Sequence, residues 1–254
     1  MRINGNIIVI TGGGSGIGRA LAEAFHALGN QVVIAGRRQA LLDETIAANP
    51  GMRSAVLDIQ SAEAIQRFAT QLKADFPGLN VVIHNAGIMR PESLQSGALA
   101  DAEATIATNL LGPIRLNAAL LPLLQTQASA TIMTVSSGLA FLPRALTPTY
   151  CATKAAIHSY TQSLRYQLRD TAVQVLELIP PYVQTELMGP GQASDPNAMP
   201  LKDFIAETMR ILTNAPELTE ICVERVKPLR FAEANGTYDG LYKKYNDAAS
   251  ASAK

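Results

Sequence analysis

Short apolar runs alternate with amphipathic stretches along most of the chain. The runs are rich in Val, Ile and Leu and are near-continuous rather than alternating, which is typical of strands buried on both faces of a sheet. We therefore predict seven strands. They lie at Ile7–Thr11, Gln31–Ala35, Ser54–Leu57, Asn80–His84, Thr131–Val135, Val173–Ile179 and Glu220–Val226.

The stretches between these runs carry apolar residues at helical spacing. One example is Ile65, Phe68, Ala69 and Leu72, which share one helical face. Gly112-Pro113 is expected to bend the longest helix. The other predicted helices cover Arg19–Gly29, Gln39–Ala48, Ala102–Leu124, Tyr150–Arg169 and Phe204–Leu212.

Repeated strand–helix units imply parallel strands joined by right-handed crossovers, with helices on both faces. The prediction is an α/β fold: a three-layer, doubly wound parallel sheet of the Rossmann type with about seven strands. We expect one domain over residues 1–247 and a disordered tail at 248–254. Ligands of such sheets bind beyond the carboxyl ends of the strands, so the residues that follow each strand are the candidate site.

Composition excludes several classes of partner. The 254 residues have a formal net charge of zero, no Trp and 5% aromatic residues, which disfavours binding to nucleic acid or an anionic membrane surface. The N-terminal apolar run is too short for a signal peptide or a membrane helix. Cys151 and Cys222 form neither a CxxC pair nor a metal cluster, so we expect no metal and a reducing, cytoplasmic location.

A glycine-rich segment, Thr11 to Gly18, joins the first strand to the first helix. Glycine allows backbone amides to approach a pyrophosphate at a helix N-terminus, although a flexible turn would have the same composition. Between the first strand and helix of a βαβ unit, the segment favours dinucleotide binding.

Gly36-Arg37-Arg38 follows the second strand, where a protein that prefers NAD usually has an acid for the ribose hydroxyl. Arginine suits a 2′-phosphate, so we predict NADPH/NADP in preference to NAD; two solvated arginines are the alternative. Asp58, after strand three, could accept a hydrogen bond from the adenine amino group or cap a helix. Asn85-Ala86-Gly87, after strand four, is a turn of small residues that could lie beneath the cofactor.

A candidate proton-transfer site follows the fifth strand. Tyr150 and Lys154 are i and i+4, so they share a helical face, and Ser137 precedes Tyr150 by thirteen residues. Tyr has an ordinary pKa of about 10, and a neighbouring ammonium should lower it toward a value useful in acid–base catalysis. A surface pair would also satisfy this spacing.

Together these residues resemble the short-chain dehydrogenase/reductase family in its single-domain form. The resemblance runs from Ile7 to about Thr185 and includes Asn109 and the Pro180-to-Thr185 segment. It implies a nicotinamide-dependent oxidoreductase acting on CH–OH or carbonyl groups. The catalytic set it implies is Asn109, Ser137, Tyr150 and Lys154. The cofactor-binding set is Gly12, Ser15, Gly16, Ile17, Gly18, Arg37, Arg38, Asp58, Asn85, Ala86, Gly87, Tyr150, Lys154, Pro180, Val183 and Thr185.

The resemblance also implies roles. Tyr150 would give a proton to the carbonyl oxygen, which Ser137 would bind. Lys154 would bind the nicotinamide ribose and lower the Tyr150 pKa, and Asn109 would hold a water that links Lys154 to solvent. Thr185 would contact the nicotinamide carboxamide. The resemblance also implies a mobile substrate lid at about 186–203, where an ordinary surface loop is the alternative. The chain departs from the family pattern at Pro181, where glycine is usual.

Leu139, Phe141, Leu187 and Met188 are candidate substrate-pocket residues, with core packing as the alternative for the first two. They favour a neutral, apolar ketone or aldehyde. Arg90 and Arg144 flank the predicted cleft, and we take them as solvated surface charges, with binding of an anionic substrate as the alternative. The predicted function is NADPH-dependent, reversible reduction of a small-molecule carbonyl. A non-catalytic dinucleotide sensor and a sugar-nucleotide epimerase remain open. We also expect at least a homodimer, through the Ala102–Leu124 and Tyr150–Arg169 helices, and a tetramer stays open.

Overall fold

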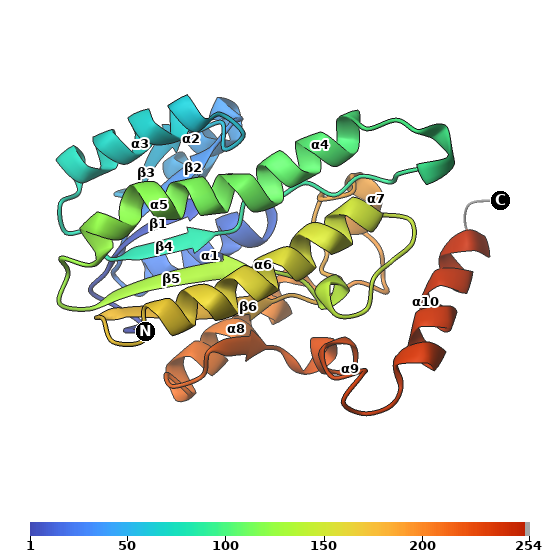
Figure 1. The fold of residues 1–254 in the computed structure, drawn as a ribbon. Helices are drawn as coiled ribbons and strands as arrows, with labels where there is room; N and C mark the ends of the chain where they lie inside the picture. Colours follow the sequence, from blue (N-terminus) through green and yellow to red (C-terminus); the bar gives the residue numbers. More distant parts are fainter. Residues whose placement is uncertain (252–254) are drawn as a thin grey trace.

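A seven-stranded parallel sheet forms the centre of the molecule in the computed structural model, which describes residues 1–251 (Figure 1). The strand order is β3-β2-β1-β4-β5-β6-β7. The chain therefore winds outward from β1 in one direction and then from β4 in the other, which leaves a crevice where the direction changes. The strands are β1 (Ile7–Thr11), β2 (Gln31–Gly36), β3 (Arg53–Val56), β4 (Val81–His84), β5 (Ala130–Val135), β6 (Val173–Ile179) and β7 (Glu220–Cys222).

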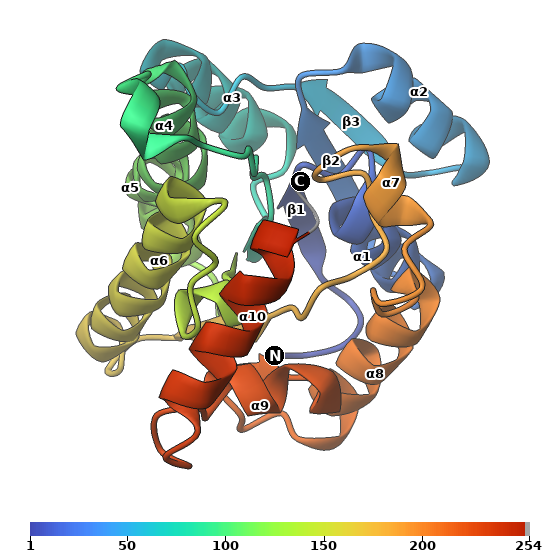
Figure 2. The same ribbon diagram turned by 90° about the vertical axis from the view of Figure 1, so that its right-hand side faces the viewer.

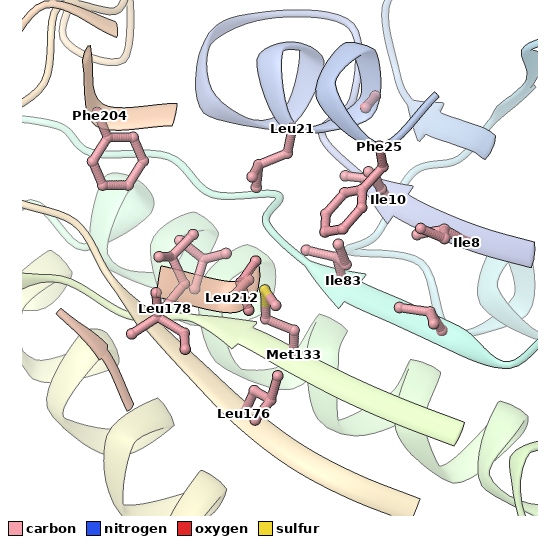
Figure 3. Close-up of a cluster of buried hydrophobic side chains, with 14 of the residues drawn as sticks. Ile8, Ile10, Leu21, Phe25, Ile83, Met133, Leu176, Leu178, Phe204 and Leu212 are labelled. Carbon is pink, nitrogen blue, oxygen red and sulfur yellow. The ribbon is translucent and has the colours of Figure 1, made fainter. Parts of the chain in front are cut away.

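Helices cover both faces of the sheet (Figures 1 and 2). One face carries α3 (Ala62–Asp75), α5 (Gly112–Leu124) and α6 (Pro148–Gln167), and the other carries α1 (Gly16–Ala27), α2 (Gln39–Ala48) and α8 (Leu201–Asn214). Side chains alternate across a strand, so neighbouring residues of β1 enter different cores: Ile8 and Ile10 pack toward α1, and Val9 packs toward α3. Figure 3 shows the first of these cores, where Leu21 and Phe25 of α1 lie above the sheet. The predicted three-layer Rossmann architecture is confirmed.

The expected long helix is divided in two. Helix α4 (Ala100–Ile106) ends in a π-helical turn at Ala107–Leu111, and α5 begins at Gly112 with Pro113 in its first turn. Proline is tolerated there because the first amides of a helix have no intrahelical acceptor. Gly112 is required by close packing, since an added Cβ would lie 2.6 Å from Ile59 Cγ1.

The seventh strand is shorter than predicted. It ends at Cys222, and residues Glu224–Val226 form a 3₁₀ turn followed by α9 (Lys227–Arg230). Val223 and Val226 are both fully buried in the same core. Residues three apart share a face in a 3₁₀ turn but lie on opposite faces in a strand, which is why the strand cannot continue to Val226.

Two further helices lie at the open end of the crevice. The segment expected to be a lid contains α7 (Pro190–Ala193), and its last residues begin α8. Helix α10 (Tyr238–Ala251) stands apart from the sheet, in front of the strand ends (Figure 2). Helix α10 extends to Ala251 and so includes the first residues of the tail expected from residue 248, while residues 252–254 lie outside the described part.

Candidate active site

A cavity of about 460 Å³ opens at the carboxyl ends of the central strands. Its lining comes from the segments that follow β1, β2, β4, β5 and β6, which is where the parallel topology predicts a ligand. One end of the cavity is formed by the glycine-rich segment, and Tyr150 and Lys154 line its interior.

Several glycines of the glycine-rich segment have a backbone conformation or a close neighbour that leaves no room for a side chain. Gly12 and Gly16 have φ angles of 68° and 53°, in the left-handed region that favours glycine. An added Cβ on Gly18 would lie 2.3 Å from the carbonyl oxygen of Gly12. The result is a concave backbone surface above the N-terminus of α1, where unpaired amides and the helix dipole favour a phosphate group.

The turn after β4 is tied to the glycine-rich segment. The hydroxyl of Thr11 accepts hydrogen bonds from the backbone amides of Asn85 and Ala86, each at 3.1 Å. The Asn85 side chain donates to the carbonyl oxygens of Thr11 and Gly12. These bonds hold the ends of β1 and β4 together at the crevice, and all three residues Asn85, Ala86 and Gly87 line the cavity. The cavity therefore fits a dinucleotide as the sequence predicts.

Arg37 and Arg38 line the cavity at the end of β2 and are exposed. Arg38 Nη2 donates to Ser15 Oγ at 2.9 Å, and neither arginine forms an ion pair with another described residue. Asp58 differs from the expectation: its neighbours Leu57 and Ile59 line the cavity, but Asp58 itself is exposed, is absent from that lining, and accepts a bond from the Gln60 amide.

Ser137, Tyr150 and Lys154 come together inside the cavity, and all three are buried. Ser137 hydrogen-bonds to the Tyr150 side chain, and its oxygen also accepts a bond from the Leu139 amide. Lys154 Nζ donates to the carbonyl oxygen of Val135 at 2.8 Å, at the end of β5. The helix α6 thus presents both residues to the strand end that carries the serine.

The electrostatics of Tyr150 differ from the prediction. Burial raises the pKa of Tyr150 well above its usual value, and the hydrogen bond from Ser137 only partly opposes that effect. The predicted lowering by Lys154 does not prevail, because the phenol is desolvated and the ammonium is bonded to Val135. Burial lowers the pKa of Lys154 to about 8, opposed by the charge of the buried Glu177.

Asn109 reaches this site from the π-helical turn. Its side chain accepts from the Ile88 amide and donates to the Ile88 carbonyl oxygen, both at 2.9 Å, and it donates to Thr153 Oγ1 at 3.2 Å. Asn109 therefore fixes the segment after β4 against α6. Its proposed link to a water stays a prediction.

The segment after β6 closes the cofactor end. Pro180, Val183 and Thr185 line the cavity, and Thr185 lies against Gly16. The buried side chain of Gln192, from α7, donates to the Val183 carbonyl oxygen and to Thr185 Oγ1. Helix α7, which lies within the expected lid, is thus hydrogen-bonded to the cavity wall.

Of the four expected pocket residues, Leu139 and Leu187 line the cavity. Met188 is absent from the lining but packs with Leu139 against Met89 and Tyr150. Phe141 does not belong to the pocket. It packs against the hydrophobic core, with its ring 4.7 Å from the ring of His158 and beneath the Arg230 guanidinium.

Among the cavity-wall residues, sequence reasoning assigned no role to Tyr182 or Tyr245, and it took Arg144 as a surface charge. Tyr182 lies inside the segment already singled out, and Arg144 lies between Ser137 and Tyr150, so both had a positional signal. Tyr245 had none, because only the folded chain brings α10 to the cavity.

Comparison with known proteins gives relatives that match most of the chain. Residues 6–195 match the sequence profile of the family described as short chain dehydrogenase. DltE, an uncharacterized oxidoreductase of Bacillus subtilis (strain 168), is 37% identical over 255 residues, which cover 97% of this chain and 98% of the relative.

Two solved structures share the fold. A short chain dehydrogenase/reductase from Burkholderia phymatum, in complex with NAD, superposes with a TM-score of 0.82 at 21% identity, over 92% of this chain and 95% of that one. A short chain dehydrogenase from Burkholderia cenocepacia J2315, in complex with NADP, gives a TM-score of 0.81 at 21% identity, over 96% and 99% of the two chains.

Proposed function

This chain belongs to the short-chain dehydrogenase family, and from that premise we propose that it is an NADPH-dependent reductase of ketones or aldehydes. The observation that carries the proposal is the meeting of Ser137, Tyr150 and Lys154 in the cavity that the glycine cradle also lines. A dinucleotide-binding protein without catalysis has no use for a buried proton donor beside a hydroxyl group. That argument favours a reductase over a sensor.

Each of the three residues has a task that follows from its surroundings. Ser137 and Tyr150 bind the carbonyl oxygen of the substrate. The bound nicotinamide dinucleotide supplies the hydride that the carbonyl carbon accepts. The proton on the Tyr150 hydroxyl then moves to the carbonyl oxygen, which completes the alcohol, and solvent replaces that proton. Because the Tyr150 pKa is raised, the phenol stays protonated at neutral pH and is suited to give a proton.

The cofactor would lie along the cavity from the glycine cradle to Lys154. Backbone amides at the start of α1 would hold the pyrophosphate, and Lys154 would hold the nicotinamide ribose. We propose NADP(H) as the preferred form, because Arg37 and Arg38 stand at the end of β2 without carboxylate partners among the described residues. The Burkholderia cenocepacia structure is a complex with NADP and the Burkholderia phymatum structure is a complex with NAD, so the choice between them has to be argued from this chain's own residues.

We further propose a homodimer in the cytoplasm. Helix α6 exposes Ala152, Ala155 and Ser159 in successive turns, and small residues allow a second helix to approach closely. The neighbouring α4–α5 segment exposes Ile106 and Leu111. Cys151 and Cys222 are free thiols, which suits a reducing compartment. No described helix is long and apolar enough to span a membrane.

The proposal is tested by following nucleotide absorbance at 340 nm with a panel of aldehydes and ketones, in both directions. The expected result is carbonyl-dependent oxidation of NADPH. Binding of nucleotide without turnover on any carbonyl or alcohol would instead support the sensor. Interconversion of sugar nucleotides without net oxidation or reduction of the nicotinamide cofactor would support the epimerase.

A further inference from the structure

Arg144 is a cation in the cavity wall that has no carboxylate partner among the residues that the structure describes. It belongs to the loop between β5 and α6 and is half-buried, and its guanidinium forms no hydrogen bond or ion pair with the described residues. Arg90, the other arginine near the cleft, is different, because it pairs with Asp101 at the surface. The sequence favours a surface charge for both arginines, but in the structure Arg90 forms a surface ion pair and Arg144 lines the cavity.

The surroundings of Arg144 are those of an anion site. Tyr182 and Tyr245 line the same cavity, and the Arg144 charge opposes the rise in pKa that burial gives both phenols. The Tyr182 hydroxyl donates to Asp195 at 3.0 Å. Along the described part of the cavity wall, Glu186 is the one carboxylate, against four cationic side chains.

Helix α10 holds this part of the wall in place. Asn246 accepts a hydrogen bond from the Ala145 amide at 2.6 Å and donates to the Pro143 carbonyl oxygen at 3.3 Å, so it grips the loop on both sides of Arg144. The adjacent residue, Tyr245, is thereby held in the wall of the cavity that Arg144 also lines. Figure 2 shows α10 standing across the strand ends, away from the helices that cover the sheet.

Arg144 is poorly placed to bind the cofactor phosphate. The arginines suited to that group, Arg37 and Arg38, follow β2, whereas Arg144 follows β5 and precedes Tyr150 by six residues. The β2 and β5 ends are separated by β1 and β4 in the sheet. A substrate whose carbonyl lies at Tyr150 would therefore meet Arg144 on the side away from the adenosine.

We propose that the substrate is a carbonyl compound that carries a carboxylate, and that Arg144, with Tyr245 beside it, binds that carboxylate. The inference rests on the proposed reductase activity and names its substrate class. It replaces the expectation of a neutral, apolar substrate: Leu139 and Met89 line the space between, and the charge lies beyond them. A guanidinium matches a carboxylate with two parallel charged hydrogen bonds, which also orients the carbonyl.

The test compares acids with their methyl esters, which keep shape and remove the charge. The pairs are succinic semialdehyde with methyl 4-oxobutanoate, and 4-carboxybenzaldehyde with methyl 4-formylbenzoate. We expect the acid of at least one pair to have a kcat/KM about tenfold to a hundredfold above its ester, mainly through KM. Arg144→Met should remove that preference by lowering the kcat/KM of the acid toward that of its ester, and Arg144→Lys should restore part of it. Arg90→Met is the matched control and should keep the preference.

A binding measurement keeps the inference testable without turnover. Calorimetry of the protein with NADP⁺ should detect benzoate but not the neutral benzamide, and Arg144→Met should lose benzoate while binding NADP⁺ as the parent does. Ester turnover with no preference for either acid in the parent would overturn the carboxylate assignment and leave the reductase standing. A preference that survives Arg144→Met would overturn the role of this residue. Binding of benzoate through Arg144, with no carbonyl turned over, would overturn the reductase and keep the anion site.

Discussion

The ammonium nitrogen of Lys154 lies 5.5 Å from the centre of the Tyr150 ring while it donates a hydrogen bond to the Val135 carbonyl oxygen. The two side chains share one face of α6, and both are buried. The lysine is therefore an oriented cation beside a neutral phenol, and it is held in place by the backbone of β5. Charge at Lys154 and a proton at Tyr150 coexist over the neutral pH range, which is the condition for proton donation.

Tyr150→Phe should abolish turnover and leave nucleotide binding intact. Phenylalanine keeps the buried ring and removes the one hydroxyl placed to give a proton. We expect a fall in kcat of at least about a thousandfold, with the nucleotide Kd within about twofold of the parent. Tyr166→Phe is the control, because that ring lies on the same helix but is 68% exposed. Activity of a few per cent or more in Tyr150→Phe would remove Tyr150 from the mechanism.

Lys154→Met should stabilise the fold while it destroys activity. The folded-state pKa of Lys154, about 8, lies below its ordinary 10.5, so the unfolded chain binds the proton more tightly. Protonated Lys154 therefore lowers the free energy of unfolding. This destabilisation is complete below pH 8 and disappears as the pH rises to 10.5. After allowing for the unpaired Val135 carbonyl, we expect the variant to be about 1–2 kcal/mol more stable at pH 7.

Urea denaturation at pH 7, 8, 9 and 10 checks this expectation, with the exposed Lys202→Met as control. The advantage of Lys154→Met should shrink steadily across that range, and the control should show no such trend. A variant that is less stable than the parent at every pH would mean that Lys154 stabilises the fold, which would contradict this prediction.

Sequence patterns predict the parts of the site that depend on one element or one turn. Tyr150 and Lys154 are i and i+4 on a helix, so their meeting follows from helical geometry. The glycine cradle follows from its place between β1 and α1. The direction of the Tyr150 pKa does not follow from spacing, because it is decided by how deeply the fold buries the phenol. Tyr245 also escapes prediction, since only tertiary packing brings α10 to the β5–α6 loop.

Phe141 illustrates the same limit. Its position near Ser137 suggests a pocket residue, and yet the 3₁₀ turn at Gly138–Ala140 rotates the chain so that the ring enters the core. The direction of the chain through this turn decides whether a side chain lies in the cavity or in the core, and the local sequence does not reveal that direction. Leu139, two residues earlier, faces the cavity instead.

Gly18→Ala should weaken both the fold and the cofactor site. The added methyl would lie 2.3 Å from the Gly12 carbonyl oxygen and from Asn85 Nδ2, so the backbone of the cradle must move. We expect a loss of about 1–3 kcal/mol in stability and a tenfold or greater rise in the nucleotide Kd. Gly240→Ala in α10 is the control, because nothing lies within 4 Å of its added Cβ. Unchanged nucleotide affinity in Gly18→Ala would place the pyrophosphate elsewhere.

The proposed dimer depends on the small exposed face of α6. Ala155→Arg should convert the dimer to a monomer, because a long charged side chain would separate two closely packed helices. Light scattering at micromolar concentration should give twice the 27.0 kDa chain mass for the parent. Ala47→Arg, at an exposed position of α2, should leave the mass unchanged. A monomeric parent would rule out the dimer.

Preference for NADPH over NADH should depend on Arg37 and Arg38. Both line the cavity at the end of β2, and the preceding residue is Gly36, so no acid stands there to repel a 2′-phosphate or to bind a ribose hydroxyl. A charged hydrogen bond from a guanidinium contributes about 1.5–3 kcal/mol, and exposure of both side chains favours the lower half of that range. We expect a preference of about tenfold in kcat/KM, which declines at high salt.

Arg37→Asp should weaken NADPH, because it removes a cation and adds a charge that repels phosphate, and it should leave NADH unchanged or improved. Arg38→Ala also frees Ser15 from its 2.9 Å hydrogen bond, so its effect combines charge with a change in the cradle. Arg53→Asp is the control, since Arg53 is exposed at the start of β3, whereas the cavity lies at the carboxyl ends of the strands. The decisive measurement is kcat/KM for both nucleotides in each variant. Equal values in the parent, or a ratio that survives substitution of both arginines, would show that Arg37 and Arg38 are surface charges without a role in cofactor choice.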